Sequence, residues 1–142
     1  MKSVRRKERV PFSASQMFDL VNDVGAYPEF MHWCRGAKVH HASDEWVEAT
    51  LEVGIGGLRK ELSTRNRLER PSRIAIELLN GPFRSLEGEW GFTEADGGCE
   101  VSLRLDFEVS SMPLKFVFER LFEEIARSQV AAFIERAKEI YA

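Results

Sequence analysis

The sequence predicts an α+β fold in which an antiparallel sheet is covered by one long C-terminal helix. Between residues 37 and 109, apolar and polar residues alternate in short runs separated by turn-forming residues. This alternation is typical of antiparallel strands with one buried and one solvated face. An amphipathic pattern then extends from Pro113 to Tyr141, and at about 1.5 Å per residue such a helix measures roughly 42 Å. The helix must therefore lie across the whole sheet.

The predicted elements form one domain. A chain of 142 residues is long enough for a single full core, which we expect to span residues 1–142. If the sheet curves around the helix, the two enclose an interior space. This arrangement favours a protein that holds a ligand over a catalyst.

The chain begins with a strand and two short helices. Residues 3–10 predict the strand. Ser13 and Gln16 have the spacing of a capping box, which marks a helix start. Asn22-Asp23 can end that helix and begin a second helical turn over residues 24–27.

Six further strands follow, and each is bounded by turn-forming residues such as Gly54–Gly57 and Asp96-Gly97. They are predicted at residues 37–41, 46–53, 58–68, 74–78, 86–92 and 99–109.

The long helix changes its apolar face midway. Residues placed at about 100° per step give a second-half stripe rotated by roughly 100° from the first. The first stripe consists of Leu114, Val117, Phe118, Leu121, Phe122 and Ile125; the second consists of Val130, Phe133, Ile134, Ala137, Ile140 and Tyr141. We expect one half to pack on close-fitting core and the other to roof a more open region, with Gln129 at the changeover.

Polar residues interrupt the face of strand 58–68 that should be dry. Lys60, Thr64 and Asn66 alternate there with leucines, and a buried lysine without a partner is costly. Either this strand is inverted or bulged, or its inner face meets a cavity. An apolar cavity with a few polar groups is the usual composition of a small-molecule site.

The first strand is basic. The first nine residues carry a net charge of +4, whereas the whole chain carries −3. The basic residues Arg5, Arg6, Lys7 and Arg9 could meet phosphate on RNA or on lipid headgroups at a membrane surface. Alternatively, they are a charged edge that prevents sheet-to-sheet aggregation.

Motifs for catalysis or metal binding are weak. His40 and His41 are adjacent on a strand and point to opposite faces, and His32-x-Cys34 offers two ligands where zinc requires three or four. Phosphate-loop, dinucleotide and G-x-S-x-G patterns are absent. We therefore expect no catalytic residue and no metal site.

The sequence also indicates a cellular location. It contains no apolar run of about 20 residues, the length that crosses a membrane, and its charged N-terminus lacks the apolar core of a signal peptide. Cys34 and Cys99 are expected to be free thiols of a cytoplasmic protein.

Several segments, spread over essentially the whole chain, resemble the bacterial ribosome association toxin A family. That family is similar to the mitochondrial coenzyme Q-binding proteins and lies within the polyketide cyclase and START-like lipid-transfer superfamily. The segments are Val10-Pro-Phe-Ser13, Met17-Phe18, Leu20-Val21-Asn22-Asp23-Val24, Tyr27-Pro28-x-Phe30, Gly81-Pro82-Phe83, Trp90-x-Phe92 and Arg136-Ala-Lys-Glu-Ile-Tyr141.

The resemblance implies a helix-grip fold and two different functions. Relatives bind the isoprenoid quinone ubiquinone in a tunnel and support respiration, or bind the large ribosomal subunit and block its association with the small one, as toxins. A third alternative, a polyketide aromatase or cyclase, would need a tunnel lined with acids and bases. His32 stands where the family usually has proline, so either the loop is looser here or His32 contacts a polar head.

We expect a non-enzymatic carrier of a hydrophobic isoprenoid, with ubiquinone as the bound ligand and the large ribosomal subunit as the alternative partner. The tunnel wall is expected to consist of Trp90, Phe92, Leu103 and Leu105. Its roof would consist of Phe118, Leu121, Phe122 and Ile125, and its mouth of Tyr27, Phe30, Trp33 and Phe83. A quinone carbonyl could accept a hydrogen bond from Lys60, Asn66 or Gln129.

Overall fold

The computed structural model describes residues 1–142 and contains seven strands, two α-helices and one 3-10 helix, η1. Every element predicted from the sequence is present, with ends that shift by a few residues. The elements are β1 (Lys2–Val10), α1 (Ala14–Asn22), η1 (Val24–Glu29), β2 (Cys34–Ala42), β3 (Trp46–Ile55), β4 (Leu58–Glu69), β5 (Arg73–Asn80), β6 (Phe83–Ala95), β7 (Gly98–Val109) and α2 (Lys115–Tyr141).

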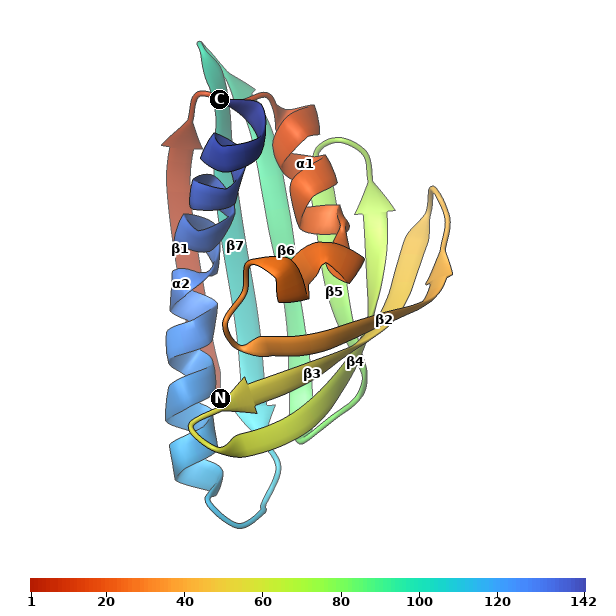
Figure 1. Cartoon of the computed structure of the whole chain (residues 1–142), viewed down its shortest axis with the longest axis vertical. Helices are drawn as coiled ribbons and strands as arrows, with labels where there is room; N and C mark the ends of the chain where they lie inside the picture. Colours follow the sequence, from red (N-terminus) through yellow and green to blue (C-terminus); the bar gives the residue numbers. More distant parts are fainter.

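The strands form one antiparallel sheet in the order β1-β7-β6-β5-β4-β3-β2. β2 to β7 follow one another as a meander, and β1 joins at the far edge beside β7. The sheet curls so that β2, β3 and β4 sweep across in front of β5 and β6, while α2 runs along β1 and β7 (Figure 1). This is the helix-grip arrangement that the family resemblance implies.

The predicted capping box fixes the start of α1. Ser13 Oγ accepts a hydrogen bond from the Gln16 backbone N–H at 3.1 Å, and Gln16 Oε1 accepts one from the Ser13 N–H at 2.9 Å. Glu94 Oε1 accepts a hydrogen bond from the backbone N–H of Ala14, the next residue, at 2.9 Å. These bonds satisfy donors that the first helical turn leaves open, and they join α1 to the end of β6.

The long helix α2 buries one stripe along its whole length, which corrects the sequence expectation that the apolar face rotates by roughly 100° midway. The two halves do pack on different clusters of the core. The buried residues recur at intervals of three or four; they are Phe118, Phe122, Ala126, Gln129, Val130, Phe133 and Ala137. Leu114 and Val117, which were assigned to the first buried stripe, are exposed. Leu121 and Ile125 are only half-buried. Apolar residues of the first half therefore occupy two adjacent faces of the helix.

The interior consists of two hydrophobic clusters. The larger one lies under α1, η1 and the second half of α2, and its aromatic centre includes Phe133, Tyr27 and Trp90. The smaller one lies under the first half of α2, where Phe83 contacts Phe122 with ring centroids 4.8 Å apart. Both ends of α2 are therefore held by aromatic packing.

The first half of α2 provides a matched test of this packing. Phe118 is 1% exposed and packs on Phe83 at 5.9 Å between ring centroids, whereas Phe116 is 79% exposed. We expect Phe118→Ala to lower the free energy of unfolding by about 3–5 kcal/mol. Phe116→Ala should change it by less than about 0.5 kcal/mol, because the site is already in solvent. Urea unfolding of both variants measures the difference, and equal effects would contradict the assignment of the buried stripe.

Candidate functional site

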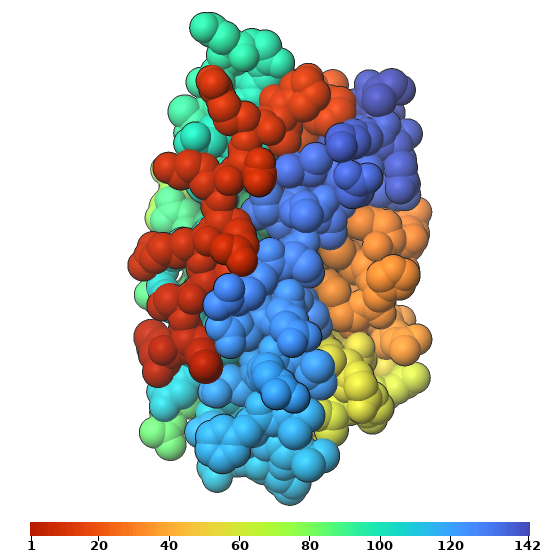
Figure 2. Space-filling view, turned by 90° about the vertical axis from the view of Figure 1, so that its left-hand side faces the viewer, coloured from red at the N-terminus to blue at the C-terminus, as the bar shows by residue number.

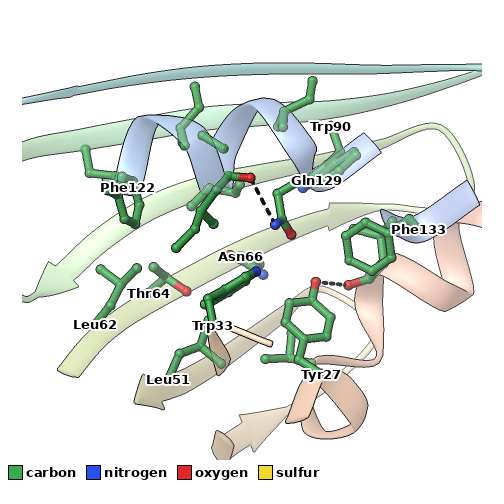
Figure 3. A pocket seen from close by; sticks show the side chains of 18 residues that line it. Tyr27, Trp33, Leu51, Leu62, Thr64, Asn66, Trp90, Phe122, Gln129 and Phe133 are labelled. Atoms are coloured by element: carbon green, nitrogen blue, oxygen red, sulfur yellow. Dashed lines mark hydrogen bonds between the residues drawn. The ribbon is translucent and has the colours of Figure 1, made fainter. Parts of the chain in front are cut away.

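A cavity of about 110 Å³ lies at the junction of the two hydrophobic clusters, beneath the middle of α2. Of the 18 residues that line it, 15 are hydrophobic. Figure 3 shows Phe122, Gln129 and Phe133 of α2 on one side, and Trp33, Leu51 and Asn66 opposite them. Phe122 of the smaller cluster and Phe133 of the larger one both line this space, so the cavity lies between the two clusters.

Nine residues that were predicted for the ligand site line this cavity. They come from five elements and from the connection between η1 and β2; they are Tyr27, Trp33, Asn66, Trp90, Leu103, Leu105, Phe122, Ile125 and Gln129. The structure thus brings together wall, roof, mouth and polar residues that are far apart in the sequence. Their role in binding a ligand stays a prediction.

Three predicted site residues belong to the packed core and do not line the cavity. Phe118 and Phe83 face each other in the smaller cluster, where Phe83 also packs on Phe107. Phe92 stacks beside Trp90 and meets the edge of Phe18 of α1. The alternating pattern places such residues on the inner face but does not say which of them have space in front of them.

Three other predicted residues lie outside the cavity for different reasons. Leu121 and Phe30 line a groove on the outside of α2, because Leu121 lies on the flank of the buried stripe. Lys60 is half-buried near the start of β4, opposite Val53, and does not line the cavity. Because Lys60 is close to the first residue of β4, its charged side chain can reach solvent over a short distance.

The polar inner residues of β4 do face the cavity. Thr64 and Asn66 both line it, and the pairing of β4 with β5 shifts by one residue between Ser63 and Thr64. The register skips Leu79, so the bulged strand is β5 and not β4; of the alternatives that the sequence leaves open for β4, the structure shows the cavity. A bulge increases local bending and twist, and here it lies where the sheet turns around the cavity.

Two polar atoms at the cavity have no hydrogen-bond partner. They are the indole N–H of Trp33 and the side-chain oxygen of Asn66, and both are buried. Gln129 points toward them from α2 (Figure 3), and its amide N–H donates only to the Ile125 carbonyl, at 3.2 Å. An unsatisfied buried polar group costs about 1–3 kcal/mol. An apolar cavity that keeps such groups is suited to a ligand with one polar end.

The cavity contains almost no acid–base chemistry. Tyr27 is its single titratable residue; its hydroxyl donates to the Val21 carbonyl at 2.5 Å, and burial raises the pKa of the hydroxyl far above its usual value. The two thiols lie elsewhere and are free. Burial raises the pKa of Cys34 and raises that of Cys99 to about 11, so both stay protonated at neutral pH.

The cavity adjoins a groove of about 320 Å³ on the outer side of α2. The groove lies between the helix, the loop after η1 and the end of β3, and His32 is one of its exposed residues. Trp33, Ile125 and Gln129 line both the groove and the cavity. These three side chains, which we call the partition, therefore lie between the cavity and the groove.

Other cavity residues were missed in the sequence. They are Val21, Val24, Leu51, Leu62, Ile76, Leu86, Ala126 and Phe133. The four-residue spacing from Phe122 to Ala126 was a usable signal for the helix face, and the inner row of β4 was one for Leu62. For Val21 of α1 and Val24 of η1 no signal was available, because the position of these two elements over the sheet depends on tertiary packing.

The predicted basic patch is divided between two faces of β1. Arg5, Lys7 and Arg9 occupy alternate positions, whereas Arg6 lies on the other face of the strand. All four are exposed, and the strand forms an open edge beside α2 (Figure 2). Lys7 Nζ lies 3.8 Å from Glu100 Oε1. The charges thus flank a sheet edge and do not form one flat patch.

Comparison with known proteins gives a consistent family and fold. A family model described as polyketide cyclase / dehydrase and lipid transport matches residues 10–134. The chain is 44% identical over 142 residues to the ribosome association toxin RatA of Vibrio cholerae, covering 99% of both chains. It is 28% identical to the mitochondrial coenzyme Q-binding protein COQ10 of Drosophila melanogaster, over 94% of this chain and 57% of that protein.

The fold is shared with solved structures. A START superfamily protein from Mycobacterium smegmatis superposes with a TM-score of 0.81 at 20% identity, covering 97% of this chain and 98% of that one. None of the helices here is both long and apolar enough to cross a membrane.

Two buried alanines of α2 test whether the space beneath the helix is empty. Ala126 lines the cavity, whereas Ala137 is buried in the larger cluster away from it. We expect Ala126→Met to change the free energy of unfolding by less than about 1 kcal/mol, because the added atoms enter the cavity. Ala137→Met should cost about 1–3 kcal/mol through overpacking. Thermal or urea unfolding distinguishes them, and an equal cost at both positions would mean that the cavity is not open space.

Proposed function

Because the chain belongs to the polyketide cyclase / dehydrase and lipid transport family, we propose that its cavity binds an isoprenoid lipid of the ubiquinone type without transforming it. The protein would act as a carrier of quinone that supports respiration. One observation carries the proposal: an apolar cavity at the junction of two cores keeps an indole N–H and an amide oxygen without partners.

The polar atoms suit the head of a quinone. A quinone carbonyl accepts hydrogen bonds and donates none, and the Trp33 indole N–H can only donate. The unpaired atom of Asn66 is its side-chain oxygen, which a quinone carbonyl does not satisfy. The amide N–H groups of Asn66 and Gln129 are further donors on the same side of the cavity. We assign these three residues to the ring, and the apolar walls to its substituents.

The ligand's size requires the partition to move. The cavity holds about 110 Å³, whereas sites for drug-sized ligands measure about 300–1,000 Å³. A quinone head could therefore occupy the cavity while its tail leaves between Trp33 and Ile125 into the groove. Each CH₂ group of the tail that leaves water contributes about 0.8 kcal/mol, so the tail supplies most of the affinity and the polar contacts set the orientation.

The same residues argue against an aromatase or cyclase. Such an enzyme moves protons with positioned acids and bases, and the cavity is lined by no Asp, Glu, His, Lys or Arg. The hydroxyl of Tyr27 is already engaged with the Val21 carbonyl. The names of RatA and COQ10 describe a toxin and a binding protein. With both thiols free, we place the carrier in the reducing cytoplasm.

Cavity filling tests the proposal. We expect the protein, loaded with a short-chain ubiquinone and extracted with organic solvent, to release about one quinone per chain. Ala126→Met should lower the uptake at least tenfold, because its side chain occupies the space of the ring. Quenching of tryptophan fluorescence during titration gives the affinity, since Trp33 and Trp90 line the cavity.

Ala131→Met is the matched control for this experiment. It adds the same atoms to the same helix at an exposed position, so it should bind quinone as the unsubstituted protein does. Undiminished uptake by Ala126→Met would exclude the cavity as the binding site.

A second function, binding to the large ribosomal subunit, is favoured by one observation. The relative with 44% identity over the full length is named a ribosome association toxin. We infer that such binding would use the open edge of β1, where exposed basic residues flank the strand and could contact RNA phosphates.

A charge reversal tests this inference. Changing Arg5, Arg6, Lys7 and Arg9 to Glu should abolish co-sedimentation with large subunits and leave quinone uptake unchanged, because these side chains do not line the cavity. The matched control reverses four exposed charges elsewhere, at Lys38, Arg59, Arg67 and Arg84. Persistent co-sedimentation of the β1 variant would leave the basic strand as a charged edge only.

A further inference from the structure

An exposed apolar tip lies where β7 connects to α2, at the lower end of the molecule in Figure 1. Leu114, Phe116 and Val117 are 59%, 79% and 43% exposed. Single apolar residues on a surface are common. Three large ones within four positions form a patch, however, and patches mark surfaces that contact another apolar phase. Neither the cavity nor the basic strand includes this tip.

The backbone at the tip is held in an unfavourable conformation. Leu114 is the N-cap of α2 and has a φ of 61°, the only positive φ at a residue other than glycine. N-caps favour Ser, Thr, Asp or Asn, whose oxygens accept hydrogen bonds from the first turn; leucine offers none. Strained residues of this kind concentrate at functional sites. Stability of the helix therefore does not explain an exposed leucine here.

An apolar path leads from the tip to the cavity. Val117, Leu121 and Ile125 follow one another at intervals of four and so lie on one side of α2. Leu121 and Ile125 line the outer groove together with Ile55, and Ile125 also lines the cavity. The turn after β3 lies close to this row, since a Cβ at Gly56 would be 3.3 Å from Leu121 Cδ1.

Positive charge accompanies the apolar tip. Lys115 Nζ lies 5.8 Å from the centre of the Phe116 ring. The first six residues of α2 carry two basic side chains, Lys115 and Arg120, and one acidic one; neither basic side chain forms a salt bridge with a carboxylate. The start of a helix adds partial positive charge. Apolar side chains beside cations are the composition of segments that lie in the interface of anionic membranes.

We propose that this tip is a membrane-docking site, which inserts Leu114 and Phe116 into the interface of a phospholipid bilayer that contains anionic headgroups. The row Val117, Leu121 and Ile125 then leads an apolar ligand from the bilayer to the cavity. This path for a ligand rests on the proposed lipid-binding function. Docking itself needs no ligand and is measured separately.

Sedimentation with vesicles tests docking. The full chain, without added quinone, is mixed with vesicles of three parts phosphatidylcholine and one part phosphatidylglycerol. The unsubstituted protein should bind, and the double variant Leu114→Ser with Phe116→Ser should bind at least tenfold more weakly. Both side chains are exposed, so the variant keeps its core. Vesicles of phosphatidylcholine alone should bind the unsubstituted protein more weakly, because they lack the anionic partner of Lys115.

The matched control is Val39→Ser with Leu79→Ser. These residues are 42% and 43% exposed on β2 and β5, and their loss should leave vesicle binding unchanged. A direct reading of insertion comes from Phe116→Trp, whose added fluorescence should be quenched by brominated lipid while that of Leu79→Trp is not.

Three outcomes would overturn docking: equal binding by the tip variant and the unsubstituted protein, an equal loss in the control, or a dimer in solution that only the tip variant abolishes. Uptake of quinone delivered from detergent, measured on the same variants, separates the two proposals. If the tip variant takes up quinone but no longer binds vesicles, docking is supported; if the unsubstituted protein binds vesicles but takes up no quinone, the ligand proposal alone fails.

Discussion

The interior of this protein depends on fitting one unbroken helix against a sheet that curls. α2 has 27 residues, and the seven strands bend around it (Figure 1). A rigid rod cannot touch a curved surface everywhere unless side-chain size varies along it. Here phenylalanines fill the space near both ends, at Phe118 and Phe133, while the middle carries Ala126 and Gln129. The gap between two well-packed cores follows from that distribution.

This constraint explains why the site has the composition that it has. The residues at the junction also belong to the two hydrophobic cores, so they are almost all apolar. Asn66 and Trp33 are exceptions, because each has a buried polar atom without a hydrogen-bond partner. A sequence under selection for stability alone would replace them, because buried polar groups without partners are destabilising. Their position at the cavity is the observation on which our proposal of a bound ligand rests.

The sequence was sufficient for the order of the elements and for the inner face of each strand. The capping box at Ser13 and the alternation along β7 are local signals, and local signals determine local structure. The sequence was not sufficient to predict which of the inner-facing side chains border the cavity. Phe118 and Phe122 lie one turn apart with the same chemistry, yet only Phe122 borders the cavity. That difference depends on which strand lies opposite, so it could not be seen in the periodicity of the helix. The rotated apolar pattern marked the half-exposed flank with Leu121, because both cores pack on the same stripe of α2.

The two ends of the chain lie in unlike surroundings. Tyr141 donates to the Gln16 carbonyl at 3.0 Å, which fastens the final helical turn to α1. At the start, Lys2 Nζ lies 3.7 Å from Glu123, in the first half of α2. A fluorescent label or affinity tag fused after Ala142 would thus project from the end remote from the β7–α2 connection (Figure 1). An extension before Met1 would instead emerge beside the half of the helix that carries the outer groove, where it could hinder access.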